Sequence, residues 1–325
     1  MDALASGPLT GESRLVEIPY TRYNRPNMTL PAIILVLFSA FVHAGWNLLG
    51  KRDGADGMYF GIAALTGGVI LLPLLLIWHD VVSRIPPIVL LYLLPTGIFQ
   101  GLYFVGLAGA YRSGDLSVAY PVARAVPVLV VPLFATVLGT GSAPETLALV
   151  GMGVVAFGLL VIPGRQISGR SLAYAVLAGI GTTGYSIIDD RALAVYRAAF
   201  VGGAATRFHI VQLPIIYSAF QAITTALFLG LIGLVSLGRA GYARELRRTS
   251  LRSAGIAGVA IILAYGLVLV AYGFATNVGY VVAFRQVSLP IGTLLGITVL
   301  REKVGTARIA GTALIVSGLV LVGLG

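Results

Sequence analysis

Residues 278–300 read VGYVVAFRQVSLPIGTLLGITVL, an apolar run that contains a single charged side chain, Arg285. A helix of about 20 apolar residues is long enough to cross the hydrocarbon core of a bilayer. Working outward from this run, short breaks that carry Arg, Asp, Gly or Pro divide the chain into ten apolar segments. They cover residues 30–49, 58–78, 87–111, 116–138, 146–162, 172–188, 210–237, 254–274, 278–300 and 304–324.

The overall composition agrees with a chain embedded in lipid. Hydrophobic residues make up 58% of the 325 residues and charged residues only 10%, whereas ordinary soluble domains carry about 25% charged residues. Membrane-spanning strands would need segments of about ten residues with strict alternation, which the sequence lacks. The 42 glycines suit helices whose backbones approach closely. The sequence therefore predicts an all-α integral membrane protein with ten transmembrane helices.

Several classes of site are disfavoured by the residues present. The chain has no cysteine, which excludes disulfides, thiolate metal sites and a cysteine nucleophile. The net charge of +10 fits basic loops held against anionic lipid better than nucleic-acid binding. Residues 45–51 match the start of a phosphate-binding loop, but Arg52 replaces the hydroxyl residue and the match lies within an apolar segment. We predict no cofactor, no metal and no nucleic-acid partner.

An internal repeat relates the two halves of the chain. Tyr111 is followed thirteen residues later by Arg124, as Tyr272 is followed by Arg285. Two further matches pair Gly151 and Gly158 with Gly311 and Gly318, and Gly45-Trp46-Asn47 with Gly184-Tyr185-Ser186. Each half holds five segments, and an odd number gives the halves opposite orientations in the membrane. The prediction is two inverted five-helix repeats, at residues 30–163 and 170–325.

The polar segment before the first apolar run has no hydrophobic periodicity, and we interpret residues 1–29 as a flexible tail. The alternative is a signal peptide cleaved near Val42-His43-Ala44. The apolar stretch from Leu30 to Leu49 is longer than the usual apolar region of a signal peptide, and the tail before it is long and acidic, which favours the first interpretation.

The combination of these motifs resembles the drug/metabolite transporter superfamily, and more narrowly its bacterial EamA-type members. The resemblance lies in ten spans in two five-helix halves, a Gly-aromatic-polar motif late in the first helix of each half, and a tyrosine that opens the fourth. The chain end is also similar, with Arg301-Glu302-Lys303 before the glycines at 311 and 318. The resemblance covers Leu30 to Gly325. It implies export or exchange of amino acids, related metabolites or drugs, and the superfamily also includes sugar-phosphate and nucleotide-sugar carriers.

One position departs from the family pattern. The first-half position that matches Glu302 is Ser142, and Glu145 lies three residues further on. The acidic marker is therefore present only in the second half, and no role is carried onto Glu145.

The strongest candidates for a binding site are Arg124 and Arg285. They lie eight residues after Leu116 and seven after Val278, roughly 11–12 Å into each span at a rise of about 1.5 Å per residue. A charged side chain at this depth is costly and usually functional. The planar guanidinium suits a carboxylate, phosphate or phosphonate. Alternatively, each arginine bonds backbone carbonyls freed by nearby prolines such as Pro127 and Pro290.

Polar and aromatic residues near the two arginines are candidates for the lining of a substrate cavity. Tyr120 precedes Arg124 by four residues and shares its helix face, whereas Gln286 points away from Arg285 by about 100°. His43 lies one helical turn before Asn47 and is a candidate proton carrier. Each could instead pack structurally. The predicted lining comprises Trp46, Asn47, Gln100, Tyr103, Tyr120, Tyr185, Tyr265 and Tyr280, with Asn277 and Gln286 also nearby.

The acidic residues are expected outside the spans. All twelve are assigned to the tail, loops or helix ends, with Asp115, Asp189 and Asp190 nearest to the membrane interior. A proton-coupled exporter of cations would ordinarily need a carboxylate in its cavity, so this assignment disfavours that class.

These observations favour a secondary transporter that moves a small anionic or zwitterionic metabolite by alternating access. The partners would be that substrate, with a carboxylate or phosphate-like group, and membrane lipid, for a monomer or homodimer. The alternatives are a lipid-phosphate flippase on the same scaffold and an intramembrane enzyme, which the absence of intramembrane acids disfavours. The expected location is the inner or plasma membrane. Counting positive charges favours external termini, whereas the family resemblance implies cytoplasmic ones, which we adopt.

Overall fold

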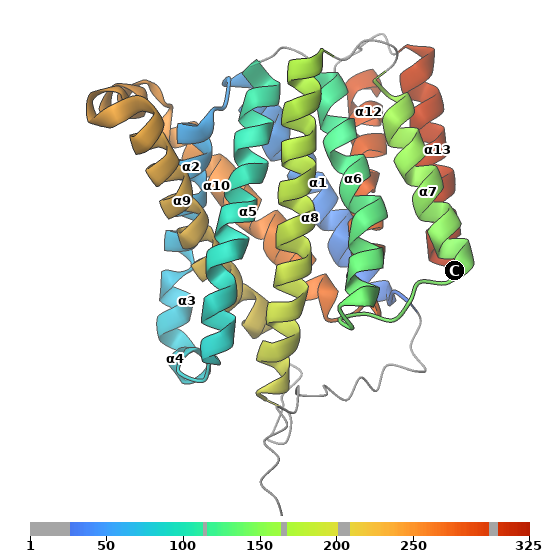
Figure 1. Ribbon diagram of the computed structural model, residues 1–325, viewed down its shortest axis with the longest axis horizontal. Helices are drawn as coiled ribbons and strands as arrows, with labels where there is room; N and C mark the ends of the chain where they lie inside the picture. The colour runs from blue at the N-terminus through green and yellow to red at the C-terminus, as the bar shows by residue number, and fades with distance from the viewer. Residues whose placement is uncertain (1–26, 113–115, 164–167, 201–208, 299–304) are drawn as a thin grey trace, which may run out of the picture.

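The computed structural model describes residues 27–112, 116–163, 168–200, 209–298 and 305–325, which form a bundle of helices (Figure 1). The predicted tail up to residue 26, Asp115 and Glu302 lie outside these ranges. The helices are α1 Leu30–Arg52, α2 Gly57–Ile70, α3 Leu72–Ile77, α4 His79–Val82, α5 Pro87–Arg112, α6 Leu116–Val137, α7 Thr146–Val161, α8 Gly169–Ala198, α9 His209–Arg248, α10 Leu251–Tyr272, α11 Val278–Phe284, η1 Arg285–Val287, α12 Ser288–Thr298 and α13 Thr306–Leu324.

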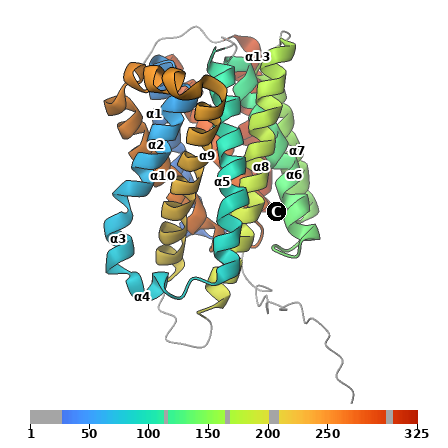
Figure 2. The same ribbon diagram turned by 60° about the vertical axis from the view of Figure 1, so that its left-hand side comes forward.

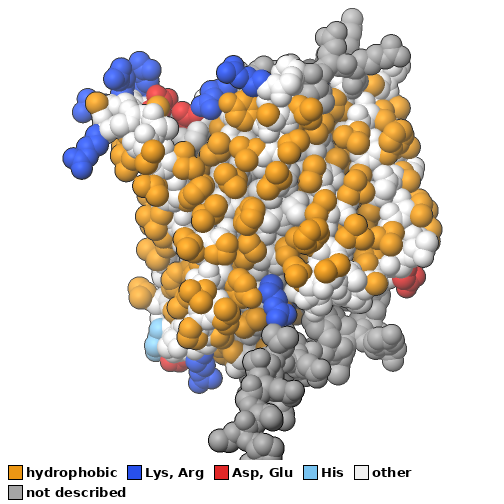
Figure 3. All heavy atoms as spheres, in the orientation of Figure 1, with side chains coloured by type: hydrophobic (Ala, Val, Ile, Leu, Met, Phe, Trp, Pro, Cys, Tyr) orange, Lys and Arg blue, Asp and Glu red, His pale blue; other side chains and the backbone are white. Residues whose placement is uncertain are grey.

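The described helices confirm the prediction of a helical membrane protein. Eight stretches are long and apolar enough to cross a bilayer: seven lie in α1, α5, α6, α8, α9, α10 and α13, and the eighth runs through α2 and α3. Helix α7 has 16 residues, and residues 278–298 are divided among α11, η1 and α12. Hydrophobic side chains cover the flank of the bundle, and charged side chains gather toward its two ends (Figure 3). The chain is therefore an all-helical, multi-pass membrane protein.

Polar residues in the breaks set the helix starts. Asp56 caps α2, where its carboxylate accepts a hydrogen bond of 2.8 Å from the backbone N–H of Tyr59. Ser250 and Ser168 cap α10 and α8 in the same way. Such caps satisfy backbone donors that have no partner in the first helical turn. The breaks read from the sequence therefore contain the residues that cap the start of the following helix.

The close contact of α7 with α13 depends on glycine. A Cβ on Gly151 would lie 2.7 Å from the carbonyl oxygen of Gly318, and a Cβ on Gly318 would lie 2.7 Å from that of Gly151. The same reciprocal contact joins Gly158 to Gly311, at 2.8 and 2.6 Å. Any side chain would separate these antiparallel backbones, so the glycines matched in the repeat form a helix interface.

One end of the bundle is closed by backbone pairing between distant segments. Met28 and Ala275 form an isolated antiparallel bridge, with Thr29 N–H donating to the Phe274 carbonyl at 3.2 Å. The side-chain amide of Asn27 donates to the carbonyl oxygen of Gly325. The start of α1 and the end of α13 therefore lie at the same end of the bundle.

Two helices extend beyond the apolar segments that predicted them. Helix α8 continues ten residues past Ile188, to Ala198. Helix α9 continues past Leu237 to Arg248, with a kink at Gly238, whose φ of 65° is left-handed. The charged residues Asp189, Asp190 and Arg239 were interpreted as marking helix ends, but α8 and α9 continue past them.

Candidate functional site

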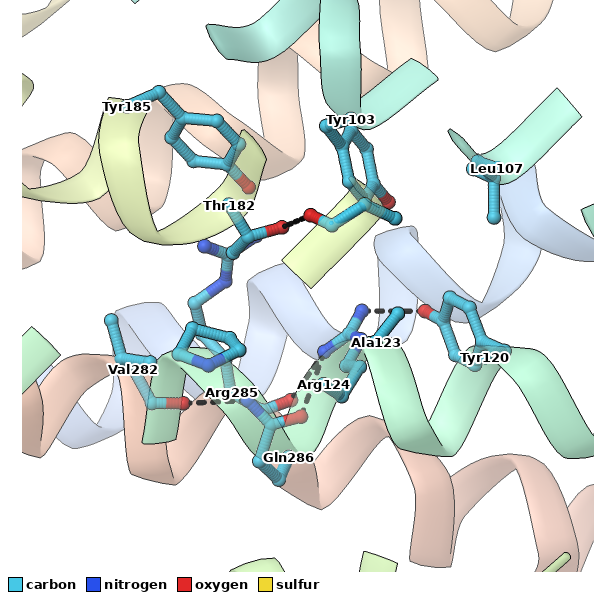
Figure 4. Close-up of a pocket in the computed structure, with 12 residues that line it drawn as sticks. Tyr103, Leu107, Tyr120, Ala123, Arg124, Thr182, Tyr185, Val282, Arg285 and Gln286 are labelled. Atoms are coloured by element: carbon cyan, nitrogen blue, oxygen red, sulfur yellow. Dashed lines mark hydrogen bonds between the residues drawn. The ribbon is translucent and has the colours of Figure 1, made fainter. Parts of the chain in front are cut away.

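A small cavity lies between α5, α6, α8 and the broken segment made of α11 and η1 (Figure 4). It offers about 20 Å³ to the centres of water molecules, and one buried water needs roughly 10–15 Å³. The cavity therefore has room for one or two waters, and it is too small for a metabolite unless helices move. It is lined by Tyr103, Leu107, Tyr120, Ala123, Arg124, Pro127, Ala178, Thr182, Tyr185, Val282, Arg285 and Gln286.

Arg124 is 8% exposed and is held by groups from three helical segments. One guanidinium nitrogen donates to Gln286 Oε1 at 3.2 Å and to the backbone carbonyl of Arg285 at 3.4 Å. The other donates to the Tyr120 hydroxyl at 2.5 Å and contacts Nε2 of His43. The Tyr120 ring lies beneath the guanidinium, 4.8 Å from its central carbon. Every contact fixes the orientation of the guanidinium and leaves its charge uncompensated.

The contact with His43 defines the state of that imidazole. A guanidinium can only donate hydrogen bonds, so His43 Nε2 must accept and the ring proton must lie on Nδ1. The Tyr120 hydroxyl also lies 2.8 Å from Nε2, and Trp46 packs edge-on against the imidazole, with ring centroids 4.7 Å apart. His43 therefore supports Arg124 as a neutral ring in this arrangement, and its predicted role as a proton carrier stays a prediction.

Arg285 lies where the helical segment of residues 278–298 changes its type of helix. The backbone changes from α-helix to a 3-10 turn at Arg285–Val287 before α12 begins. Pro290 has no N–H to donate to the carbonyl four residues earlier, which weakens the helix at this point. The guanidinium lies over the Tyr265 ring, 5.6 Å from its centre. Irregular helix within an apolar run is tolerated where it lines a cavity, and Val282, Arg285 and Gln286 of this segment line the cavity described above.

Neither cavity arginine has a carboxylate partner within the described ranges. Their neighbours are hydroxyl, amide, imidazole and carbonyl groups, which carry no negative charge that would cancel the positive charges. Two guanidinium groups thus border one cavity without a bound negative charge. An anion with several oxygens is the ligand that this arrangement would hold most strongly.

The predicted lining residues divide into three groups. Arg124, Arg285, Tyr120, Tyr103 and Tyr185 all line the cavity. His43, Trp46 and Asn47 form a layer behind it, with Asn47 donating to the His43 carbonyl at 2.8 Å. Gln100 and Tyr265 line a second cavity, between α2, α5, α9 and α10.

Three side chains that were expected in or near the lining of a substrate cavity have other contacts. Tyr280 is buried against the start of α7, where its hydroxyl accepts from the Glu145 N–H at 3.4 Å. Asn277 caps α11 at the closed end of the bundle. The Gln286 side chain points away from Arg285. It accepts a hydrogen bond from Arg124, which lies on α6 across the cavity.

The expectation that the acids lie at helix ends outside the spans is wrong for Asp189 and for its neighbour Asp190, which are both buried within α8. Asp189 shows the reason. This residue lies within α8, fully buried, and its carboxylate accepts four side-chain hydrogen bonds. The apolar run stops at Ile188, so the following acidic pair was read as a helix end. The helix continues because three other helices supply donors for the charge, and a single sequence does not show donors from distant segments.

Asn277 holds together the closed end of the bundle. Its amide nitrogen donates to the carbonyls of Ser142 at 2.9 Å and Pro132 at 3.3 Å, while its Oδ1 accepts from the Gly279 N–H at 2.7 Å. These contacts tie the loop after α6 to the start of α11.

We expect Asn277→Ala to lower the free energy of unfolding by about 1–2 kcal/mol, because it removes a helix cap and the amide hydrogen bonds to the carbonyls of Ser142 and Pro132. Asn277→Ser, which keeps a capping oxygen and loses the amide donors, should fall between this variant and the original protein. Thermal unfolding in detergent measures the order of the three. Equal stability of all three would show that the amide does not hold this end.

Within the described ranges, no group of three or more His, Cys, Asp or Glu side chains could hold a metal ion. No family model matches the chain, and no curated protein matches it. Among solved structures, one described only as "Crystal structure of protein" is similar, with a TM-score of 0.61 and 17% identity over 90% of this chain and 97% of that one. The fold of this chain is therefore shared by a solved protein across nearly its whole length.

Proposed function

We propose that the protein is a secondary transporter that moves a small anionic or zwitterionic metabolite across a cell membrane by alternating access. The observation that carries the proposal is the pair of buried guanidinium groups, Arg124 and Arg285, at one cavity without a carboxylate partner in the described ranges. A charge in a membrane interior is costly and is retained where it binds a substrate or ion. A carboxylate or phosphate-like group would supply the missing negative charge.

The pairing of helices supports two inverted five-helix repeats. Helix α5 packs along α8, and α1 packs along α10. In an inverted repeat, α1 would correspond to α8 and α5 to α10. The contact of α5 with α8 would then correspond to the contact of α10 with α1, and both contacts are present. Helices α2 and α9 pack on each other, as do α7 and α13. Such corresponding contacts are expected for halves related by a two-fold axis in the membrane plane.

The size of the cavity supports a cycle of opening and closing. Its present volume excludes a metabolite, and one end of the bundle is closed by the contacts of Asn277 and by the bridge between Met28 and Ala275. Substrate would enter by separation of the helices that line the cavity from the opposite end. Rocking of one half against the other would then expose the site to each side in turn. This cycle is of the drug/metabolite transporter type that the sequence resembles.

The proposal is tested with purified protein in sealed liposomes. A thermal-shift screen of amino acids, other small carboxylates and organic phosphates selects the probe. We expect radiolabelled probe to enter liposomes preloaded with the unlabelled compound, without added nucleotide, because exchange needs only alternating access. Replacement of the exposed Arg52 by Gln is the control and should exchange at the original rate.

Other outcomes separate the competing functions. Movement of a labelled phospholipid between leaflets without uptake of any soluble probe would indicate a lipid flippase. Conversion of the probe into product without net movement would indicate an enzyme. Uptake that requires ATP inside the vesicles and is indifferent to ionophores would contradict secondary transport.

A further inference from the structure

We propose that Asp189 is a proton-binding site coupled to the anion cavity, so that a proton and the anionic substrate travel together. The coupling rests on the proposed transport function, whereas the proton site rests on the structure around the carboxylate. Asp189 lies in α8, one helical turn beyond the cavity residue Tyr185.

Four donors from three other helices surround the carboxylate. Oδ1 accepts from the Thr96 hydroxyl of α5 at 2.5 Å and from the Tyr217 hydroxyl of α9 at 2.8 Å. Oδ2 accepts from Gln221 Nε2 of α9 at 2.6 Å and from the Tyr265 hydroxyl of α10 at 2.5 Å. None of these neighbours is a cation. The carboxylate is therefore stabilised by hydrogen bonds alone, and it can accept a proton without breaking an ion pair.

The four residues that donate to the Asp189 carboxylate can also accommodate its protonated form. A carboxylic acid needs an acceptor for its own hydrogen, and a hydroxyl group both donates and accepts. Three of the four neighbours are hydroxyl groups, those of Thr96, Tyr217 and Tyr265. When the proton binds to Oδ2, the Tyr265 hydroxyl can turn from donor to acceptor while Gln221 keeps its bond.

A second cavity gives water access to this shell. It lies between α2, α5, α9 and α10, and Gln221 and Tyr265 are among the residues that line it. Its space for water centres is about 20 Å³, enough for at least one water molecule. A water there adjoins two of the four residues that hold the carboxylate, and can deliver a proton to it or remove one.

Tyr265 connects the carboxylate to the anion cavity. Its hydroxyl donates to Asp189, while its ring lies beneath the guanidinium of Arg285 and 5.3 Å from the ring of Tyr185. Both Arg285 and Tyr185 line the anion cavity. A change at either end of this contact therefore alters the electrostatic surroundings of the other.

The sign of the coupling follows from the charges. An anion bound at Arg285 adds negative charge near Asp189, which disfavours the carboxylate and favours its protonated form. Release of the anion has the opposite effect, so the proton leaves with it. The other titratable groups near Asp189 are Tyr217 on α9, Tyr265 and Tyr272 on α10, and Tyr185 and Asp190 on its own helix, while α5 contributes Thr96, which is not titratable.

Infrared difference spectroscopy tests the proton site without any transport. Purified protein in lipid discs is titrated from alkaline to acidic pH, and the carbonyl band of a protonated carboxylic acid is followed. The other acids of the chain also give such a band on acidification, so the contribution of Asp189 is the part of the band that Asp189→Asn removes. We expect Asp190→Asn, which changes the neighbouring buried acid, to retain that part. Identical bands at every pH in the original protein and in folded Asp189→Asn protein would overturn the proposal.

A second variant keeps the test decisive if Asp189→Asn does not fold. Tyr265→Phe removes one donor from the carboxylate and retains the ring beneath Arg285. Losing one hydrogen bond to a charged group should move the appearance of the band to higher pH by about one pH unit or more. An unchanged titration in folded Tyr265→Phe protein would count against Asp189 as the group observed.

Addition of inorganic phosphate separates this inference from the proposed function. If the coupling holds, phosphate should shift the band to higher pH in the original protein and leave it unmoved in Arg285→Gln. Phosphate that stabilises the protein against heat but produces no Asp189 band would refute the proton site and leave the anion site standing. An Asp189 band that phosphate never moves, in a protein that phosphate does stabilise, would refute the coupling.

Discussion

Arg285→Gln and Arg124→Gln should each weaken binding of the anionic substrate roughly 10- to 150-fold, because each removes a charge-assisted contact of about 1.5–3 kcal/mol. Both variants should remain folded in the membrane, since glutamine retains an amide that can satisfy neighbouring carbonyls. Lysine at either position keeps the charge and loses the planar fork, so we expect partial binding. Substrate affinity from equilibrium binding, and exchange in liposomes, measure the effect.

The alternative role of the arginines gives a different pattern. Arg124 does donate to the backbone carbonyl of Arg285, so part of its contribution supports the broken helix. If that were its whole role, Arg124→Gln would reduce expression and melting temperature while the surviving protein bound substrate normally. Arg52→Gln, at an exposed ion pair with Asp53, controls for the loss of a surface charge. Unchanged affinity in stable Arg285→Gln protein would remove that residue from the site.

Gly158→Ala should destabilise the protein by about 1–3 kcal/mol, the usual effect of inserting an atom into a packed interface. The added Cβ would lie 2.8 Å from the Gly311 carbonyl oxygen and 3.0 Å from the Ile315 backbone nitrogen, and neither atom can move without shifting α13. Reversible unfolding in mixed detergent gives the difference in free energy.

Gly153→Ala is the matched control because it makes the same change on the same helix, where a Cβ would meet nothing within 4 Å. It should be neutral, or stabilising by up to about 1 kcal/mol, because alanine favours a helix more than glycine does. Similar destabilisation by the two substitutions would mean that helix propensity, and not the approach of α13 to α7, accounts for the effect at Gly158.

Much of the helical architecture could be read from the sequence because apolar length and polar breaks carry it locally. The segment predicted at 146–162 corresponds to α7 at Thr146–Val161, since its ends are marked by a change of composition. The segment at 278–300 was predicted as continuous, but the structure breaks it at Arg285. Prolines elsewhere do not predict such a break, because α6 contains Pro121, Pro127 and Pro132 and is not broken.

The candidate site was only partly predictable, for a related reason. Depth within an apolar run and the repeat placed Arg124 and Arg285 together, and the four-residue spacing placed Tyr120 beside Arg124. Asp189 was misplaced because its burial depends on donors that lie far away in the sequence, such as Thr96 and Gln221. A local sequence pattern indicates that burying a charge is costly, but it does not show which distant residues donate hydrogen bonds that offset this cost.

The kink at Gly238 changes the direction of α9 at one end of the bundle. Beyond it, α9 turns away from the other helices at the top left of Figure 1, a course that Figure 2 shows from a second side. The exposed arginines of this region are Arg239, Arg244, Arg247, Arg248 and Arg252. Moving these guanidinium groups into the hydrocarbon core is costly, so this region should resist being drawn into the lipid. We therefore expect α9 to stay at a constant depth in the bilayer if other helices tilt during transport.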